Sequence, residues 1–250
     1  MNVYRIGVIS LGLIFLWQAV VWITRVPPYI LPPPLSVVRA MLGHGPELLG
    51  HAGITLVEIV AGLAIGTLFG AGSAMLMMIS RNIKHWLMPV LVISQAIPVF
   101  ALAPLLVLWF GYGMASKIAM AVLIIFFPVT AAFYDGLRRT EPQWMELARV
   151  MDAPSNAVLL QVQVPAALPA LASGLRVATA VAPIGAVVGE WVGSSAGLGF
   201  YMLHANARMQ VDMMFAALAL LTAMALILYF VIDSCLRHLV FWQSEQEGNE

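Results

Sequence analysis

The chain alternates long apolar stretches with short polar ones. A helix needs about 20 mostly apolar residues to cross about 30 Å of hydrocarbon. Lipid offers no hydrogen-bond partners to the backbone, so each crossing is expected to be helical. Six stretches meet this length, and the predicted spans are residues 6–24, 52–80, 87–110, 116–134, 168–188 and 214–236.

The composition agrees with this pattern. Hydrophobic residues make up 62% of the 250 residues and charged residues 10%, and the mean hydropathy is +0.93. About a quarter of the residues in soluble domains are charged. We therefore expect an all-α, polytopic membrane helix bundle. The 12 basic residues balance the 12 acidic ones, which gives no reason to expect nucleic acid as a partner.

The distribution of Lys and Arg predicts the orientation, because cytoplasmic loops carry the excess of these residues. With the N-terminus inside, seven fall on inner segments and four on outer segments. The inner ones are Arg5, Arg81, Lys84, Arg138, Arg139, Arg149 and Arg237, and the outer ones are Arg25, Arg39, Lys117 and Arg208. Both termini are therefore predicted to be cytoplasmic. The first stretch is too long for a signal peptide and lacks an Ala-x-Ala site, so it is expected to remain as an anchor.

The polar segments suggest three parts. Residues 1–50 are expected to hold the first membrane helix and an outer Pro-rich segment, and residues 51–240 the main transmembrane domain. Residues 241–250 form a polar, acidic tail. Within the main domain, the insert at residues 135–165 carries charged, proline-broken helical patterns, and the orientation places it in the cytoplasm.

The insert begins with a helix signal. TEPQ at residues 140–143 fits a capping box, in which the Thr140 hydroxyl and the Gln143 amide satisfy free N–H groups, and Pro142 suits a first turn. The residues that follow place one apolar stripe on a helix, with Glu146 and Arg149 on other faces. The stripe consists of Trp144, Leu147, Ala148 and Met151.

The sequence DAPS then ends this helix. Pro154 disfavours helical geometry at Ala153, and Asp152 tolerates a left-handed turn. Ser155 is expected to cap a second short helix, which ends before Pro165. Two short helices joined at an angle form either a rigid protrusion that transmits force to the spans, or an interfacial helix lying on lipid.

This insert resembles the EAA loop of ABC importer permeases, which docks into a cleft of the cytoplasmic ATPase. The matching residues of ELARVMDAPSNAVLLQVQVPAALP are Glu146, Ala148, Pro165, Leu168 and Pro169. Leu147 and Asp152 depart from the usual Ala and Gly, and Asp replaces Gly at a left-handed position cheaply. The resemblance implies ATPase coupling by Trp144, Glu146, Leu147, Ala148, Met151, Asp152, Ala153, Pro154 and Ser155.

Further segments resemble permeases of the sulfonate, taurine and nitrate type, a group that includes thiamine-precursor transporters. They are YILPPPLSVVRAM, ALAPLLVLWFGYG, FFPV and SSAGLG. The resemblance implies a type I ABC importer permease fold in a bacterial inner membrane. It also implies a homodimer, a separate ATPase and an extracytoplasmic substrate-binding protein. The run from VAPIGAVVGEWVG to VDMMFAAL is most similar to permeases for the pyrimidine precursor of thiamine; sulfonate, taurine, nitrate and riboflavin remain alternatives.

Several polar and proline residues within or beside the spans are candidates for the substrate pathway. They are Gln95, Pro98, Pro183, Glu190 and Trp191. An acidic group beside an aromatic face suits an aminopyrimidine, although Glu190 could instead cap the loop that follows it. Glu58 either faces the pathway or reaches the interface, and Arg176 and Asp233 are expected to be interfacial anchors.

The sequence gives little support for ATP hydrolysis, metal binding or catalysis by this chain. No G-x-x-x-x-G-K-[ST] loop is present, so ATP hydrolysis is assigned to another subunit. The five histidines show no metal-ligand spacing, and we expect no metal, cofactor or catalytic residue. GSSAG at residues 193–197 fits the G-x-S-x-G motif of serine hydrolases. Ser195 could act as a nucleophile only on a strand-to-helix turn, whereas here it lies in a loop between predicted membrane helices. A secondary transporter is the other alternative, but it should show inverted repeats, and the sequence shows none. The small residues of GLAIGTLFGAG offer either an internal packing face or the dimer contact.

Overall fold

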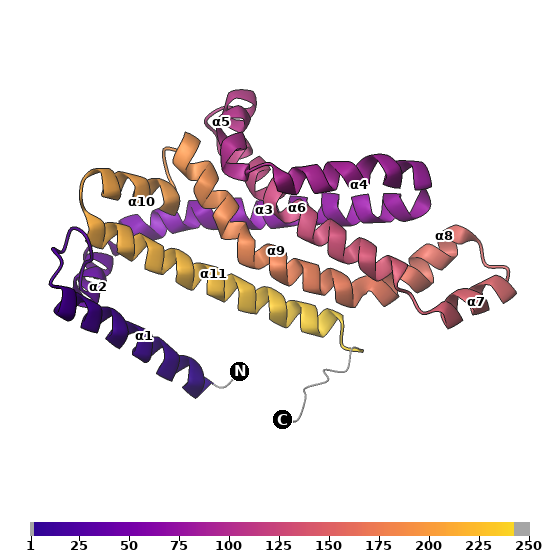
Figure 1. The fold of residues 1–250 in the computed structure, drawn as a ribbon, viewed down its shortest axis with the longest axis horizontal. Helices are drawn as coiled ribbons and strands as arrows, with labels where there is room; N and C mark the ends of the chain where they lie inside the picture. Colours follow the sequence, from indigo (N-terminus) through magenta and orange to yellow (C-terminus); the bar gives the residue numbers. More distant parts are fainter. Residues whose placement is uncertain (1–2, 243–250) are drawn as a thin grey trace.

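The computed structural model describes residues 3–242, all of whose regular elements are helical (Figure 1). This confirms the predicted all-α class; residues 243–250 of the predicted tail lie outside the described part. The helices are α1 (Val3–Thr24), α2 (Pro34–Gly43), α3 (Gly45–Ile79), α4 (Arg81–Ala96), α5 (Val99–Phe110), α6 (Met114–Arg138), α7 (Pro142–Val150), α8 (Ser155–Val158), the π-helical turn η1 (Leu159–Gln163), α9 (Val164–Gly193), α10 (Leu198–Ala207) and α11 (Val211–Leu239).

The centre of the bundle is α6, which packs against both α3 and α9. Glycines of α3 allow this close approach: a Cβ at Gly66 would lie 2.7 Å from Cγ2 of Ile125 on α6, and one at Gly70 would lie 2.9 Å from Cγ1 of Val129. The small-residue stripe predicted on α3 is therefore an internal packing face.

Within residues 3–242, four helices are long and apolar enough to span a bilayer, and a bent pair, α4 and α5, raises the number to five if the pair is one span. The predicted span at residues 87–110 is broken into two helices, because α4 and α5 meet at 106°. Pro98 disfavours helical geometry at the residue before it, and Ile97 is extended (φ −80°, ψ 122°). The predicted first span falls on α1, whose described apolar part is shorter, Leu11–Thr24.

The second insert helix does not end before Pro165, contrary to the prediction. α8, η1 and α9 form one continuous helix of 39 residues, Ser155–Gly193. The Val164 N–H bonds to the Leu159 carbonyl, five residues back, so the helix is widened just before the proline. π-Helical segments usually occur as such single turns inside α-helices, where they can bend the helix. The second half of the insert is thereby continuous with α9.

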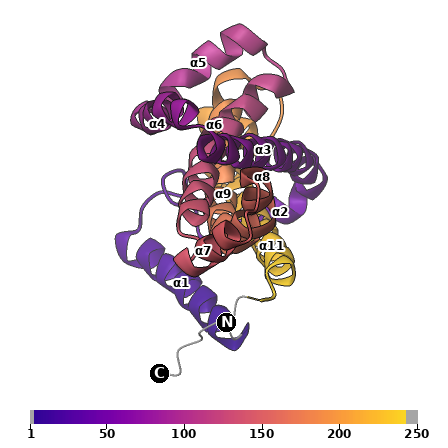
Figure 2. The ribbon, with the colours of Figure 1, turned by 90° about the vertical axis from the view of Figure 1, so that its right-hand side faces the viewer.

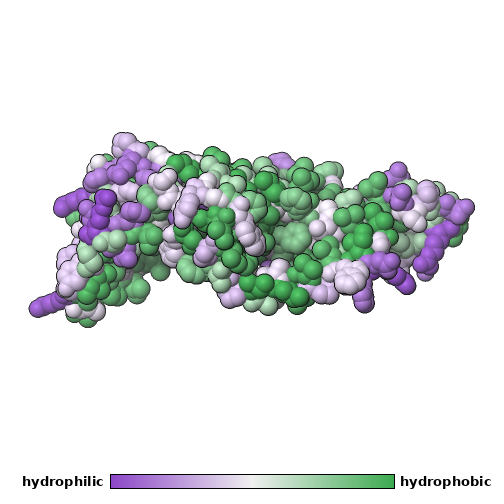
Figure 3. Space-filling view, turned by 90° about the horizontal axis from the view of Figure 1, so that it is seen from above, coloured by the Kyte–Doolittle hydropathy of each residue, from purple (hydrophilic) through white to green (hydrophobic). Residues whose placement is uncertain are grey.

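The long axis of the molecule separates two polar ends. α2 and α10 lie at one end and α7 and α8 at the other (Figure 1), and hydrophilic residues gather at both ends around an apolar middle (Figure 3). Viewed from the α7–α8 end, α3, α6, α9 and α11 lie between α5 and α1 (Figure 2). This distribution suits a bundle whose long axis crosses a bilayer.

Candidate functional site

The start of α7 differs from the predicted capping box. Glu141 occupies the N-cap position, and the Thr140 hydroxyl donates back to the Leu137 carbonyl over 3.1 Å. Glu141 accepts a hydrogen bond through Oε2 from Nε1 of Trp144 at 3.0 Å. Pro142 lies in the first turn as predicted. The helix thus begins one residue later than the capping box implied.

The turn after α7 confirms the prediction for Asp152, whose φ of 51° is left-handed. The Ala153 N–H bonds to the Ala148 carbonyl and the Asp152 N–H to the Arg149 carbonyl, at 3.0 and 3.1 Å. These two bonds form a Schellman motif, which satisfies the free carbonyls at a helix end. Ser155 is the first residue of α8 rather than its cap, a position that Pro154 takes.

An apolar surface is exposed on α7 and its turn, at one polar end of the molecule. We call Trp144, Leu147, Val150 and Met151 the α7 surface; all four side chains are more than half exposed, and Val150 reaches 85%. Ala148, predicted to belong to this stripe, is buried instead. The predicted stripe also missed Val150, which lies three residues after Leu147 and could have been found by that spacing.

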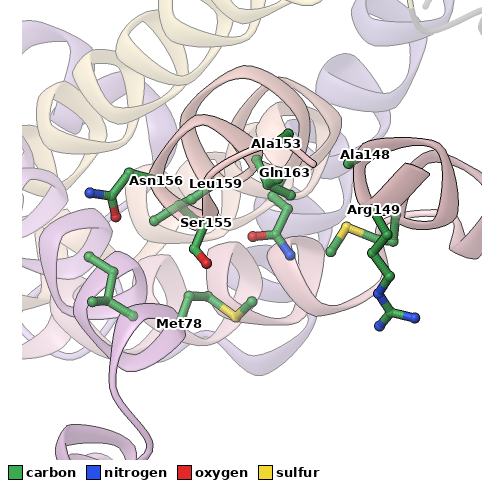
Figure 4. Close-up of a pocket in the computed structure, with 11 residues that line it drawn as sticks. Met78, Ala148, Arg149, Ala153, Ser155, Asn156, Leu159 and Gln163 are labelled. Atoms are coloured by element: carbon green, nitrogen blue, oxygen red, sulfur yellow. The ribbon is translucent and has the colours of Figure 1, made fainter. Parts of the chain in front are cut away.

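Behind the α7 surface lies a pocket of about 400 Å³ (Figure 4). Its walls come from the end of α3, from α7 and from the α8–η1 segment. They include Met78, Ile79, Met145, Ala148, Arg149, Ser155, Asn156, Leu159 and Gln163. Residues of α3, α7 and the α8–η1 segment thus face one another across this pocket.

The structure separates the five predicted pathway residues into two groups. Gln95 and Pro98, at the bend between α4 and α5, are exposed, as is Trp191 on α9. Pro183 and Glu190 are buried on α9. The first group can face a pathway directly, whereas the second lies among packed helices.

The Glu190 carboxylate ties three segments together. Its Oε1 accepts a hydrogen bond from the Thr55 hydroxyl of α3 at 2.6 Å. Its Oε2 accepts from the Gly199 and Phe200 N–H groups at the start of α10, at 2.5 and 3.3 Å. These contacts support the interpretation that Glu190 caps the loop that follows it, because a carboxylate at a helix N-terminus satisfies free N–H groups.

Glu58 is fully buried, so the interpretation that it reaches the interface is wrong. Lys117 Nζ lies 3.1 Å from its Oε1. Lys117 is likewise buried, within α6, although the orientation count assigned it to an outer segment. Burying one of these charges without the other would be strongly unfavourable. The pairing could not be predicted from the sequence, because the two residues lie far apart along the chain.

Arg176 and Asp233 were predicted as separate anchors, but the structure pairs them. Arg176 Nε donates to Asp233 Oδ1 at 2.6 Å, and Arg237 Nε donates to Oδ2 at 3.0 Å. Arg176 lies on α9 and the other two on α11. The carboxylate therefore links the two helices toward the end at which α7 lies.

The surroundings of Ser195 do not form a nucleophile elbow. The loop that holds it follows a helix, α9, rather than a strand. The neighbouring Ser194 hydroxyl bonds within the loop to Ala196, and the His204 ring approaches its own helix at the Phe200 carbonyl, 3.1 Å away. This geometry gives no support to hydrolase chemistry.

Comparison with known proteins gives consistent matches. Residues 62–244 match the model of the family described as binding-protein-dependent transport system inner membrane component. A "probable ABC transporter permease protein" of Haemophilus influenzae is 59% identical, over 92% of this chain and 94% of its own. The formylaminopyrimidine transport permease protein ThiX of Halalkalibacterium halodurans is 36% identical, over 94% and 96%. The fold resembles a crystal structure of an amino acid ABC transporter, with a TM-score of 0.62, 19% identity and coverage of 81% of this chain and 96% of that one.

Proposed function

The chain belongs to the family of binding-protein-dependent transport system inner membrane components, and from this premise we propose that it forms the translocation pathway for a thiamine pyrimidine precursor. It is a multi-pass permease subunit of the inner membrane rather than an enzyme, and ATP hydrolysis belongs to a separate subunit. We propose a homodimer whose two copies enclose the pathway, with a substrate-binding protein delivering solute on the outer side. Each closed dimer would then present two inserts.

The α7 surface is the observation that carries the coupling proposal. Four apolar side chains exposed on a short helix outside the spans need a partner, since such patches mark interaction sites. We assign that partner as the cleft of the cytoplasmic ATPase, with Trp144, Leu147 and Met151 entering it and the Asp152 turn fixing the angle of approach. Motion of the ATPase would displace α7 and, through η1, α9. A conformational change requires such a partner, one that prefers one state.

The substrate assignment rests on the similarity to ThiX and on the exposed Trp191, whose ring can stack on a pyrimidine. Gln95 and Pro98 are proposed to line the same pathway at the α4–α5 bend. Pro183 and Glu190, being buried, would shape the pathway from behind it.

Reconstituted uptake tests this function. Proteoliposomes containing the permease, its ATPase and its binding protein should accumulate labelled formylaminopyrimidine or hydroxymethylpyrimidine only with ATP inside. An ATPase lacking its P-loop lysine should abolish uptake. ATP-driven uptake of taurine or riboflavin instead would reject the substrate alone, whereas solute uptake without any ATPase would reject the importer mechanism and indicate a secondary transporter.

A further inference from the structure

A hollow of about 880 Å³ lies along one face of α4, and the proposed transport role uses none of its residues. We call it the α4 groove. Its residues follow one another at the spacing of a single helix face. They are Arg81, Lys84, His85, Met88, Pro89, Val92 and Ile93. The groove therefore has a basic part at the start of α4 and an apolar part toward the middle of that helix.

The cations of the basic part have no acidic partner. Within residues 3–242, no ion pair involves Arg81, Lys84 or Arg138. Lys84 Nζ lies 5.6 Å from the centroid of the Tyr134 ring, and Arg138 Cζ lies 5.5 Å from the same centroid. Tyr134 is buried on α6, so one fixed ring holds both cations beside the groove. Positive charges gathered in this way attract an anion.

The groove starts at the end of the molecule where α7 and α8 lie. Met78 and Ile79, at the end of α3, line the pocket behind α7, and α4 begins directly afterwards at Arg81. From there α4 runs back along the bundle toward α5 (Figure 1). With α7 on the cytoplasmic side, the basic part lies at the level of the cytoplasmic headgroups. Val92 and Ile93, both more than half exposed, then lie at the level of the acyl chains.

A phospholipid with an anionic headgroup matches both parts of the groove, whereas other occupants match only one. A second copy of the chain packed on this face would add another set of the same cations and no acid to neutralise them. The soluble ATPase could reach the basic part, but not an apolar face that lies within the hydrocarbon. A phosphate ester that carries acyl chains supplies both the charge and the apolar surface.

We propose that the α4 groove binds one anionic phospholipid of the cytoplasmic leaflet. Arg81, Lys84 and His85 bind the headgroup phosphate, and an acyl chain lies along the apolar part of the groove. The phosphate neutralises the cations beside Tyr134 and thereby stabilises the packing of α4 on α6. The inference rests on the orientation of the proposed function, but lipid binding is measured without any uptake.

Native mass spectrometry of the purified transporter, permease and ATPase together, tests this site. The wild type should retain one phosphatidylglycerol per permease chain and bind phosphatidylcholine at least about tenfold more weakly. Arg81→Gln combined with Lys84→Gln should weaken phosphatidylglycerol binding about thirtyfold, because each basic residue near anionic lipid contributes about fivefold in affinity. Arg39→Gln combined with Arg208→Gln removes two exposed cations at the other polar end and should bind as the wild type does.

Two competitors distinguish a lipid from a bare anion. Neither inorganic phosphate nor glycerophosphoglycerol, the headgroup without acyl chains, should displace phosphatidylglycerol at equal concentration. Displacement by either one would show that the apolar part takes no part in binding, and the lipid proposal would be wrong. Equal retention of phosphatidylglycerol and phosphatidylcholine by the wild type would also overturn it.

Thermal unfolding in detergent provides the second readout and shows that the variants are folded. Phosphatidylglycerol should raise the melting temperature of the wild type and of the variant at Arg39 and Arg208, but not that of the variant at Arg81 and Lys84. An equal rise in all three proteins would place the lipid elsewhere and contradict the proposal. Failure of ATP-driven uptake, by contrast, would reject the proposed function and leave these lipid measurements unchanged.

Discussion

The carboxylate of Glu190 occupies the space into which a side chain at Gly197 would project. A Cβ at Gly197 would overlap the Glu190 carboxyl group, and the φ of Gly197, 113°, is one that other residues rarely adopt. Glycine is therefore required here both for backbone conformation and for space. This contact lets the loop after α9 close over the carboxylate and start α10.

Replacing Gly197 with alanine should therefore destabilise the permease, by about 1–3 kcal/mol, because the loop must shift and the Glu190 hydrogen bonds must lengthen. Thermal unfolding of the purified protein in detergent measures the loss. Gly53→Ala is the matched control, since a Cβ at Gly53 meets nothing within 4 Å. Equal melting temperatures for the two variants would contradict the account.

The left-handed backbone conformation of Asp152 leads to a second prediction. Asp152→Gly should keep ATP-driven uptake, because glycine adopts this conformation freely. Asp152→Val should weaken the turn by about 1–2 kcal/mol, since a β-branched residue is strained there. ATPase association and uptake, measured in membrane vesicles, should fall for the valine variant alone. If both variants behave alike, the turn does not set the docking angle.

The Arg176–Asp233 pair should stabilise the packing of α9 on α11. A double-mutant cycle with Arg176→Gln and Asp233→Asn should give a coupling free energy of about 1 kcal/mol, a value limited by solvent because Arg176 is partly exposed. The same cycle with Arg237→Gln should give about 0.5 kcal/mol, since Arg237 is more exposed. Unfolding midpoints in detergent supply the data, and zero coupling for Arg176 would show that the pair is only a surface contact.

Predictions from the sequence were most accurate where a single local rule decides the structure. Composition and apolar length predicted the helical bundle, and the tolerance of Asp for left-handed geometry predicted the turn at Asp152. Predictions of helix ends failed where neighbouring residues favour different starts or stops. Thr140 bonds back into α6, so Glu141 becomes the N-cap of α7. The π-helical turn η1 carries the helix past Pro165 where a proline rule alone predicts an end.

Long-range pairings could not be predicted from the sequence. Nothing in the local pattern indicates that Glu58 meets Lys117, or that Asp233 meets Arg176, because these partners are dozens of residues apart and their approach depends on how the helices pack. The same holds for Glu190: the sequence left pathway contact and loop capping open, and only its three donors distinguish them.

Docking should be sensitive to charge on the α7 surface. Met151→Arg is expected to abolish uptake and co-purification with the ATPase while the permease still inserts, because an arginine cannot enter an apolar cleft unpaired. Gln161→Arg adds the same charge at an exposed position of η1 and should retain both. Normal uptake by the Met151 variant would mean that the coupling surface lies elsewhere.

Crosslinking tests the central claim most directly. The chain has one cysteine, Cys235, so Val150→Cys in a Cys235→Ser background gives a single thiol at the most exposed position of the α7 surface. With the assembled transporter in inverted membrane vesicles, a maleimide that carries a photoreactive benzophenone should join this thiol to the ATPase subunit on illumination, with a yield that changes when ATP binds. The account is contradicted if the thiol forms no such product and is instead labelled from outside intact cells by a membrane-impermeant maleimide.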